Sequence, residues 1–468
     1  MKKLIQITLI IIFAYLCIYP QWFMTNLLNL DSISSTPLHK KFNPSTQQYA
    51  FLIESNKIPK GLTGVKAKDC SVCHKEIYDE WSQTTHAHAL SDLQFQAEIS
   101  KKDNPKWLCL NCHIPLKSQR KNITVALKNN DILKPISKPN PHFDKALQQE
   151  AITCAVCHLV KDKNNQAAIL GPKGSKLSPH PVVKDQKRLQ NVCIRCHQPS
   201  GDQLTPNLLC WFHPLDELKS NQSKDSCVDC HMPKNSKKIS IASLKTTSSS
   251  AHHWLGSAIP KTYKGYDTIL KRGFTPSITA SSNITTNKIT VNIQNKDSGH
   301  HLPSGDPERY FALILTTQDN KNKTSTHVAR IGQTWQWDPA KKIGDNRLKP
   351  HEAREFELPL KGSIISYSYE IWNTRLNGQN AGYMTLAKGL DEQLASNINQ
   401  DIKQLHKLYP LATLMYKENY TKNNGVIKLN SQQLLDLSKD QKNIAFRDRI
   451  YANLENFPSM PRVTASDK

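Results

Sequence analysis

Cys70-Ser71-Val72-Cys73-His74 is the first of five Cys-x-x-Cys-His segments in this chain. The others are Cys109-Leu110-Asn111-Cys112-His113, Cys154-Ala155-Val156-Cys157-His158, Cys193-Ile194-Arg195-Cys196-His197 and Cys227-Val228-Asp229-Cys230-His231. Such a segment is typical of c-type haem attachment: its thiols form thioethers to the haem vinyl groups, and its His ligates the iron. The sequence therefore predicts five covalently bound haems c, with His74, His113, His158, His197 and His231 as proximal iron ligands.

The cysteine count argues against other uses of these pairs, because ten of the 12 cysteines lie in the five motifs. A disulfide framework leaves the adjacent histidines unexplained, zinc needs four ligands per site, and a thioredoxin-like role needs one pair in a βαβ setting. Cys17 lies in the apolar N-terminus. Cys210 is interpreted as a buried apolar thiol, with a redox-sensing or catalytic role left open.

Lysine dominates the charge of the 468-residue chain, whose formal net charge is +23. Ten propionates, two on each of five haems, would lower this to about +13 if all of them ionise. The chain carries no known nucleic-acid-binding motif, so nucleic acid is not expected as a partner. The excess of Lys favours acidic redox partner proteins, although a genome bias toward Lys and Asn explains it equally well.

Residues 1–24 resemble an export signal or a membrane anchor. Met1-Lys2-Lys3 precedes an apolar run from Leu4 to Tyr19, and no small-x-small cleavage site follows that run. We therefore expect an uncleaved anchor that holds the protein on the periplasmic side of the inner membrane, where c-type haem is attached. Cleavage after export, giving a soluble periplasmic protein, is the alternative.

The next two parts of the chain are defined by composition and by the motifs. Residues 25–68 are polar and are expected to form a loop-like tether. Residues 69–262 hold all five motifs, whose first cysteines lie 39, 45, 39 and 34 residues apart. This spacing is too short for five independent haem domains. We therefore expect the haems to share one core, in a pentahaem domain of short helices and long loops with few strands.

Beyond the motifs the pattern changes. Residues 263–389 include segments that alternate as strands do and favour a β-sandwich-like domain, namely 289–293, 310–316, 355–360 and 365–372. Residues 390–468 are expected to form a mostly helical tail, because Leu394, Ile398, Ile402 and Leu405 recur at helical spacing. The predicted fold is thus multidomain: a mainly helical or irregular haem domain, a β-sandwich-like domain and a helical tail.

The second axial position of each iron is expected to be a histidine. Methionine there raises the potential, but the haem region offers only Met232, which follows His231 and cannot reach the opposite face of that haem. Low-potential bis-histidine haems are therefore predicted. The candidate ligands from the residues alone are His86 or His88, His180, and His252 or His253, with His142 and His213 weaker.

Several segments resemble the cytochrome c554 and hydroxylamine-oxidoreductase-like family of multihaem proteins. The stretch from Cys70 through Trp81 to His86-Ala87 is similar to the opening of that family, and His252-x-Trp254-x-Gly256 is similar to its distal-ligand segment. Residues 299–305 resemble its Gly-His-x-x-Pro-Thr-Gly element, with Ser304 in place of Thr. Shorter similarities are Ile152–His158, Cys196–Gln198, Asp229–Pro233 and Asp345–Pro350. The resemblance implies His86, His180, His252 and His300 as distal ligands.

The departures from that family favour electron transfer over a specific reaction. No Cys-x-x-Cys-Lys motif is present, and five motifs are fewer than the eight of hydroxylamine oxidoreductases. We therefore expect electrons to pass between a quinol-side donor and an acceptor protein. The alternative is a reductase or oxidase of a small nitrogen or sulfur compound at an open iron position. His113 is the candidate there, because its segment lacks an obvious distal His. A scaffold whose β-rich part docks a partner is a third hypothesis.

Overall fold

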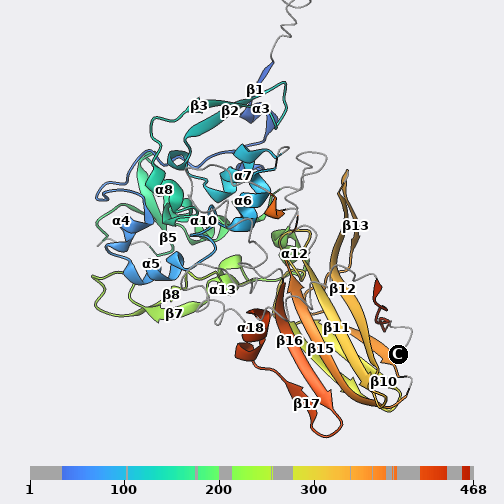
Figure 1. Cartoon of the computed structure of the whole chain (residues 1–468). Helices are drawn as coiled ribbons and strands as arrows, with labels where there is room; N and C mark the ends of the chain where they lie inside the picture. Colours follow the sequence, from blue (N-terminus) through green and yellow to red (C-terminus); the bar gives the residue numbers. More distant parts are fainter. Residues whose placement is uncertain are drawn as a thin grey trace, which may run out of the picture.

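The computed structural model describes residues 34–101, 104–173, 178–199, 213–254, 256, 278–337, 339–360, 362–375, 382, 384–386, 412–439 and 456–463. Short helices and small sheets form the part before residue 257, and long antiparallel strands form the part from Ile278 onward (Figure 1). The expected anchor, Cys17, Cys210 and the repeat at 394–405 lie outside the described residues. Within the described ranges, no helix is long and apolar enough to cross a membrane.

The haem motifs lie in or beside short helices. Helices α9 (Cys154–His158) and α13 (Cys227–His231) begin at the first cysteine of their motif, whereas α7 (Lys106–His113) begins three residues earlier. The other motif helices are α4 (Ala67–Ser71) and α11 (Ile194–His197). The remaining helices of this part are α3 (Leu38–Lys41), α5 (Lys75–Ser82), α6 (Leu93–Ile99), α8 (Lys145–Gln149), α10 (Gln186–Asn191), α12 (Pro214–Ser220), η2 (Gln48–Ala50) and η3 (Lys117–Gln119).

Strands occur among the motifs, which corrects the expectation that they would be few. One three-stranded sheet consists of β1 (Ser35–Pro37), β2 (Asn122–Lys128) and β3 (Pro135–Pro139). A second consists of β4 (Leu159–Lys161), β5 (Ala167–Gly171) and β6 (Val182–Lys184). Strands β7 (Lys234–Lys237) and β8 (Thr247–Ser250) form a hairpin. Frequent prolines disfavour strands in this region, but Pro135 and Pro139 are the two ends of β3, which is an edge strand. An edge strand tolerates proline because the missing N–H costs little there.

Residues 34–68 pack onto the haem-motif part, so they are not a free tether. Phe42 and Tyr49 are buried together with Trp107 of α7, and the ring centroids of Phe42 and Trp107 lie 6.1 Å apart. The carbonyl oxygen of Pro115 accepts the N–H of Ile53 at 2.8 Å. The overall polar composition of this segment predicted a loop, although Phe42 and Tyr49 attach it to the haem-motif part.

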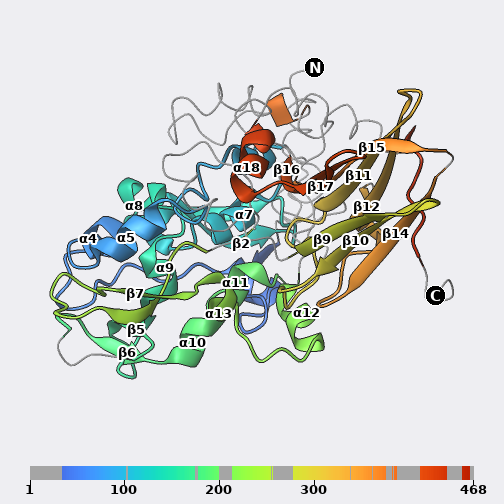
Figure 2. The ribbon, with the colours of Figure 1, turned by 90° about the horizontal axis from the view of Figure 1, so that it is seen from below.

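The C-terminal part consists of two antiparallel sheets around one core (Figure 2). The smaller has the order β14 (Ala353–Pro359), β10 (Lys288–Asn295), β9 (Ile278–Ile284). The larger has the order β13 (Ala340–Asp345), β12 (Thr324–Trp337), β11 (Tyr310–Asp319), β15 (Ile364–Thr374), β16 (Ala412–Thr421), β17 (Gly425–Lys428). Every second residue of β10 is buried, and Ile289 and Val291 share a cluster with Tyr369 of β15. A mostly antiparallel β part after the haem motifs is therefore confirmed.

Residues 412–421 and 425–428, inside the segment 390–468 that was expected to be a mostly helical tail, form strands, and residues 390–411, 440–455 and 464–468 lie outside the described residues. Strand β16 pairs with β15 along its length, β17 pairs with β16, and α18 (Ser431–Lys439) follows them. The predicted boundary at residue 389 therefore divides one sheet. The short apolar run at 411–416 is compatible with a strand or a helix, so the sequence alone does not predict which one forms. The hydrogen-bonded pairing with β15 makes β16 a strand. Near the C-terminus, isolated bridges join Ser459 to Val328 and Arg462 to Phe356, one strand in each sheet.

Candidate haem-binding centre

Three motif histidines have their Nδ1 atoms fixed by backbone carbonyls from distant segments. The Nδ1–H of His74 donates to Ile239 O at 2.6 Å, that of His113 to Ala89 O at 2.7 Å, and that of His158 to Leu170 O at 2.8 Å. A carbonyl oxygen can only accept, so Nδ1 carries the proton and Nε2 keeps its lone pair. This tautomer is the one that metal-ligating histidines adopt. Paired thiols beside such an imidazole fit haem c.

Three of the candidate distal histidines lie opposite motif histidines. The ring centroids are 6.1 Å apart for His86 and His197, 6.4 Å for His158 and His252, and 6.4 Å for His231 and His300. Metal–imidazole bonds of about 2 Å place two rings on opposite sides of one ion roughly 6 Å apart between centroids. The geometry therefore suits one iron between the members of each pair.

The other candidates differ in their surroundings. His180 has no ring contact with a motif histidine within the described residues; its Nδ1 lies 3.1 Å from Ser178 Oγ. His88 is disfavoured, because its Nε2 lies 3.2 Å from Ser82 O. His113 stacks on Phe95 with centroids 3.4 Å apart, and no histidine ring among the described residues lies opposite it. No motif or spacing in the sequence had indicated Phe95.

Burial favours the neutral form of these imidazoles. It lowers the pKa of His86 and of His252 to about 3, with a further lowering by a neighbouring histidine in each case. For the same reason the pKa of His197 falls to about 4. Desolvation penalises the charged form, and a metal ligand must be unprotonated. The three residues are therefore in the state that iron ligation requires at neutral pH.

Local contacts explain how His86 and His252 reach their positions. Ile152, next to the third motif, donates its N–H to His86 O at 3.1 Å and accepts the Trp81 Nε1–H at 2.8 Å. The ring of Trp254 lies between the two candidate ligands, with its centroid 4.7 Å from that of His86 and 5.4 Å from that of His252. Trp254 therefore packs the two histidines into one aromatic group.

Glu80 of α5 holds the segment that carries His252. Its Oε2 accepts the His252 N–H at 2.8 Å, and its carboxylate also pairs with Lys237 of β7, whose side chain is 4% exposed. Burial alone would raise the pKa of Glu80, but the hydrogen bonds from Lys237 and His252 outweigh it and hold the pKa below its usual value. Nothing in the sequence motifs indicated this ion pair.

Cysteines of different motifs contact one another. The side chains of Cys70 and Cys154, of Cys193 and Cys227, and of Cys112 and Cys196 are near neighbours. Cys157 also lies close enough to Cys196 for their charges to interact. The first motif therefore adjoins the third, the third adjoins the fourth, and the fourth adjoins the second and the fifth. Shared packing of this kind is what the short motif spacing predicted.

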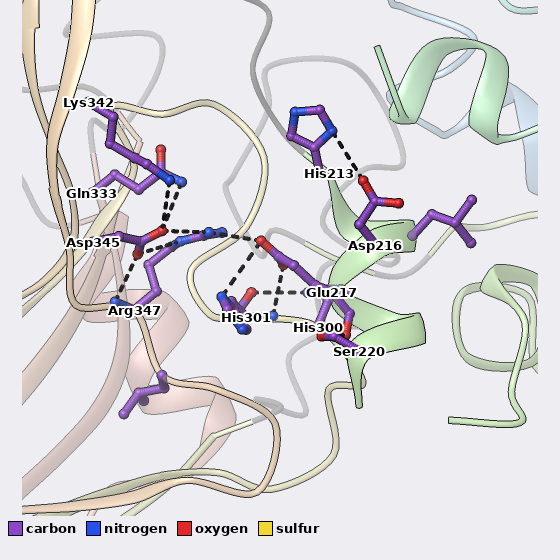
Figure 3. Close-up of polar contacts among 12 residues, drawn as sticks. His213, Asp216, Glu217, Ser220, His300, His301, Gln333, Lys342, Asp345 and Arg347 are labelled. Atoms are coloured by element: carbon purple, nitrogen blue, oxygen red, sulfur yellow. Dashed lines mark hydrogen bonds and ion pairs between the residues drawn. The ribbon is translucent and has the colours of Figure 1, made fainter. Parts of the chain in front are cut away.

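The β-rich part contacts the haem-motif part through a cluster of charged residues at α12 (Figure 3). Glu217 accepts the His301 N–H at 3.0 Å and pairs with Arg347 at 2.8 Å. Arg347 in turn contacts both oxygens of Asp345, at 3.0 and 2.9 Å. The side chains of Glu217 and Arg347 are only 12% and 10% exposed. This cluster fixes the loop that carries His300 beside the fifth motif.

Comparison with known proteins gives one family match and one similar solved structure. Residues 69–159 match the family described as cytochrome c554 and c-prime, so the chain contains a domain of that family. The fold is similar to the crystal structure of a penta-heme cytochrome c552 from Thermochromatium tepidum, with 18% identity and a TM-score of 0.51, covering 78% of this chain and 100% of that one. No curated protein matches significantly. The chain is thus a multihaem c-type cytochrome with haem c cofactors, which implies electron transfer.

Proposed function

We propose that this protein is a pentahaem electron carrier on the periplasmic side of the inner membrane, tethered by its N-terminal segment. It passes electrons between respiratory redox proteins, from a quinol-side donor to an acceptor. One haem c is bound by each motif, and His86, His252 and His300 complete the coordination of the irons held by His197, His158 and His231. His180 serves one of the two remaining haems.

The contacts between motif cysteines carry this proposal. Each such cysteine is an attachment point for a haem edge, so contacts between Cys70 and Cys154, or between Cys193 and Cys227, bring different haems together. The contacts connect all five motifs without a break. Adjacent redox groups that share one core conduct electrons from one end to the other, whereas an enzyme needs only one such group at its reaction site.

Intact mass and electron paramagnetic resonance (EPR) of the holoprotein test the proposal together. The expected mass is that of the polypeptide plus five haems, with residues 1–24 retained. The expected spectrum contains low-spin bis-histidine signals from at least the three haems with paired histidines. Fewer than five haems, or high-spin iron at the sites of His158, His197 and His231, would contradict it.

A second candidate function is supported by the surroundings of His113. Phe95 stacks on this residue, and no described histidine ring stands opposite it. An iron with a vacant position beside such a residue can bind a small nitrogen or sulfur compound, which electron transfer alone does not need. A high-spin signal together with oxidation of the haems by nitrite, or their reduction by hydroxylamine, would favour this enzyme. Entirely low-spin haem would rule it out.

A further inference from the structure

Exposed apolar side chains gather around the first haem motif. Val72, between the two motif cysteines, is 69% exposed. The loop that joins β7 to β8 adds Ile241 and Leu244, which are 68% and 97% exposed, together with Ile239. We call Val72, Ile239, Ile241 and Leu244 the motif-1 surface. Large exposed apolar groups of this kind mark contact sites when they are adjacent.

The β7–β8 loop is attached to the motif itself. Ile239 O accepts the Nδ1–H of the proximal His74 at 2.6 Å, and the Ile241 N–H donates to Cys73 O at 2.8 Å. A turn closed by the bond from Ser243 N–H to Ser240 O, at 2.9 Å, follows. The loop therefore holds its apolar side chains at the haem attachment segment.

The other motifs present no comparable surface. In the second and third motifs, Asn111 and Ala155 are buried between the cysteines. Both intervening residues of the fourth motif are half-buried, and in the fifth motif the exposed one is acidic, Asp229. Among these described positions Val72 is the exposed apolar residue. The first motif is therefore where the linked haem sites reach the surface with an apolar face.

Basic residues surround the motif-1 surface. Lys238 and Lys245 flank the apolar part of the loop, and Lys68 precedes the motif; all three are exposed. Lys75 follows the motif but pairs with Asp79 at 2.7 Å, and the exposed Glu76 beside it is acidic, so the basic excess comes from Lys68, Lys238 and Lys245. Specific interfaces combine an apolar centre with a polar rim of complementary charge. The matching partner is an acidic protein with an apolar patch.

We propose that the motif-1 surface docks an acidic electron-transfer protein, and that electrons enter or leave the chain of haems there. This inference rests on the proposed electron-carrier function. An anionic lipid surface would also attract lysines and apolar side chains. However, membrane binding would not explain why the loop bonds to His74 and Cys73, whereas electron exchange requires the partner to lie close to the haem.

The test uses the full-length holoprotein and a reduced plant-type [2Fe–2S] ferredoxin, an acidic one-electron donor protein. Stopped-flow absorbance gives the second-order rate of haem reduction at low ionic strength. The double variant Ile241→Asp/Leu244→Asp is expected to react about tenfold more slowly, because charge and lost apolar contact both oppose docking. The control Ile343→Asp changes a residue that is 61% exposed on β13 and should stay within about twofold of the wild type.

A charge variant tests the rim separately. Lys238→Glu/Lys245→Glu should slow the reaction at low salt and flatten its dependence on ionic strength, since steering by opposite charges is screened by salt. Lys321→Glu/Lys341→Glu is the control, with the same charge change on exposed positions of the β-rich part. Dithionite, a small reductant, should reduce all of these proteins at one rate.

Three results would overturn the inference. These are a wild type that reacts slowly with ferredoxin at low salt, loop variants that react at the wild-type rate, or equal losses in the loop and control variants. Binding of the wild type to phosphatidylglycerol vesicles that disappears in Ile241→Asp/Leu244→Asp, with ferredoxin reactivity unchanged, would assign the surface to lipid instead. Failure of the carrier function is recognised separately, because dithionite would then leave haems unreduced or the mass would show fewer than five.

Discussion

At the scale of single residues, His252 is the most sharply defined of the distal ligands that we propose. Its ring lies 6.4 Å from that of His158, its pKa is low because it is buried, and Glu80 fixes its backbone. The neighbouring His253 is also buried, and both histidines lie near Glu80, at 3.9 Å for His252 and 3.8 Å for His253. The position of its ring relative to His158 is therefore what favours His252.

His252→Ala should leave five haems attached, because the thioethers remain, and convert one haem from low-spin to high-spin. The midpoint potential of that haem should rise, since loss of an imidazole donor destabilises Fe(III) more than Fe(II). EPR and a redox titration measure both effects. His253→Ala is the matched control and should stay low-spin. A variant His252→Ala with only low-spin iron and unchanged potentials would show that another residue is the ligand.

The variant Glu80→Gln removes the negative charge beside His252 but keeps the shape of the side chain. The amide can still accept the His252 N–H, but Lys237 loses its partner while it is 4% exposed. Breaking a buried pair costs roughly 3–5 kcal/mol, whereas an exposed pair contributes about 0–1 kcal/mol. Urea unfolding should therefore show a large loss for Glu80→Gln and almost none for Asp79→Asn, whose partner Lys75 is 68% exposed. Equal losses would contradict the role assigned to Glu80.

At the scale of elements, the cluster of Glu217, Arg347 and Asp345 joins α12 to the β-rich part beside His300. Arg347→Ala removes the cation that joins Glu217 to Asp345, and leaves Asp345 with only Lys342 as a cation among the described residues, at 3.7 Å. We expect the loop of His300 to loosen, and the EPR signal of the haem on the fifth motif to broaden or become high-spin. Arg330→Ala, on β12 and outside the cluster, should leave that signal unchanged. A sharp low-spin signal from Arg347→Ala would show that Arg347 does not position the loop of His300.

The same cluster predicts a pH dependence. Burial would raise the pKa of Asp345, but the hydrogen bonds and charge of Arg347 outweigh it and lower the pKa below the ordinary value of 3.8. Its contribution to stability is therefore complete above pH 3.8 and is lost as the pH falls through the folded-state pKa. Asp345→Asn should abolish this part of the acid sensitivity, as measured by thermal melts from pH 6 downward. Melting curves that fall equally in both proteins would disprove it.

Elements also show what the sequence alone can predict. The motifs predict the haem attachment residues, and the chain length after His231 allows His252 to return to the haem core. Strand β16 and the packing of Phe42 were missed, because both depend on partners distant in sequence. The contact of Glu217 with Arg347 spans 130 positions, the difference between their numbers, and no local pattern reports it. The ligand assignments of His86, His180, His252 and His300 remain predictions.

At the scale of the whole molecule, the haem motifs pack against one another, so we expect each bound haem to support its neighbours. Cys154→Ala/Cys157→Ala should remove one haem and lower the stability of the entire N-terminal part, because Cys154 contacts Cys70 and Cys157 is coupled to Cys196. Intact mass should show four haems, and thermal melting should occur at lower temperature. Cys210→Ala, outside every motif, is the control and should retain five. Five haems in the double variant would contradict the motif assignment.

The arrangement of the motifs makes the fourth one the junction, since its two cysteines contact the second and the fifth motifs. Cys193→Ala/Cys196→Ala should therefore isolate two haems from electrons that arrive at the first motif. Cys227→Ala/Cys230→Ala removes an end of the network and should isolate none. Stopped-flow reduction by ferredoxin measures this as the share of the remaining haem absorbance that changes in the fast phase. That share should fall for the first variant and stay complete for the second, whereas equal fast phases in both would mean that the haems connect by another route.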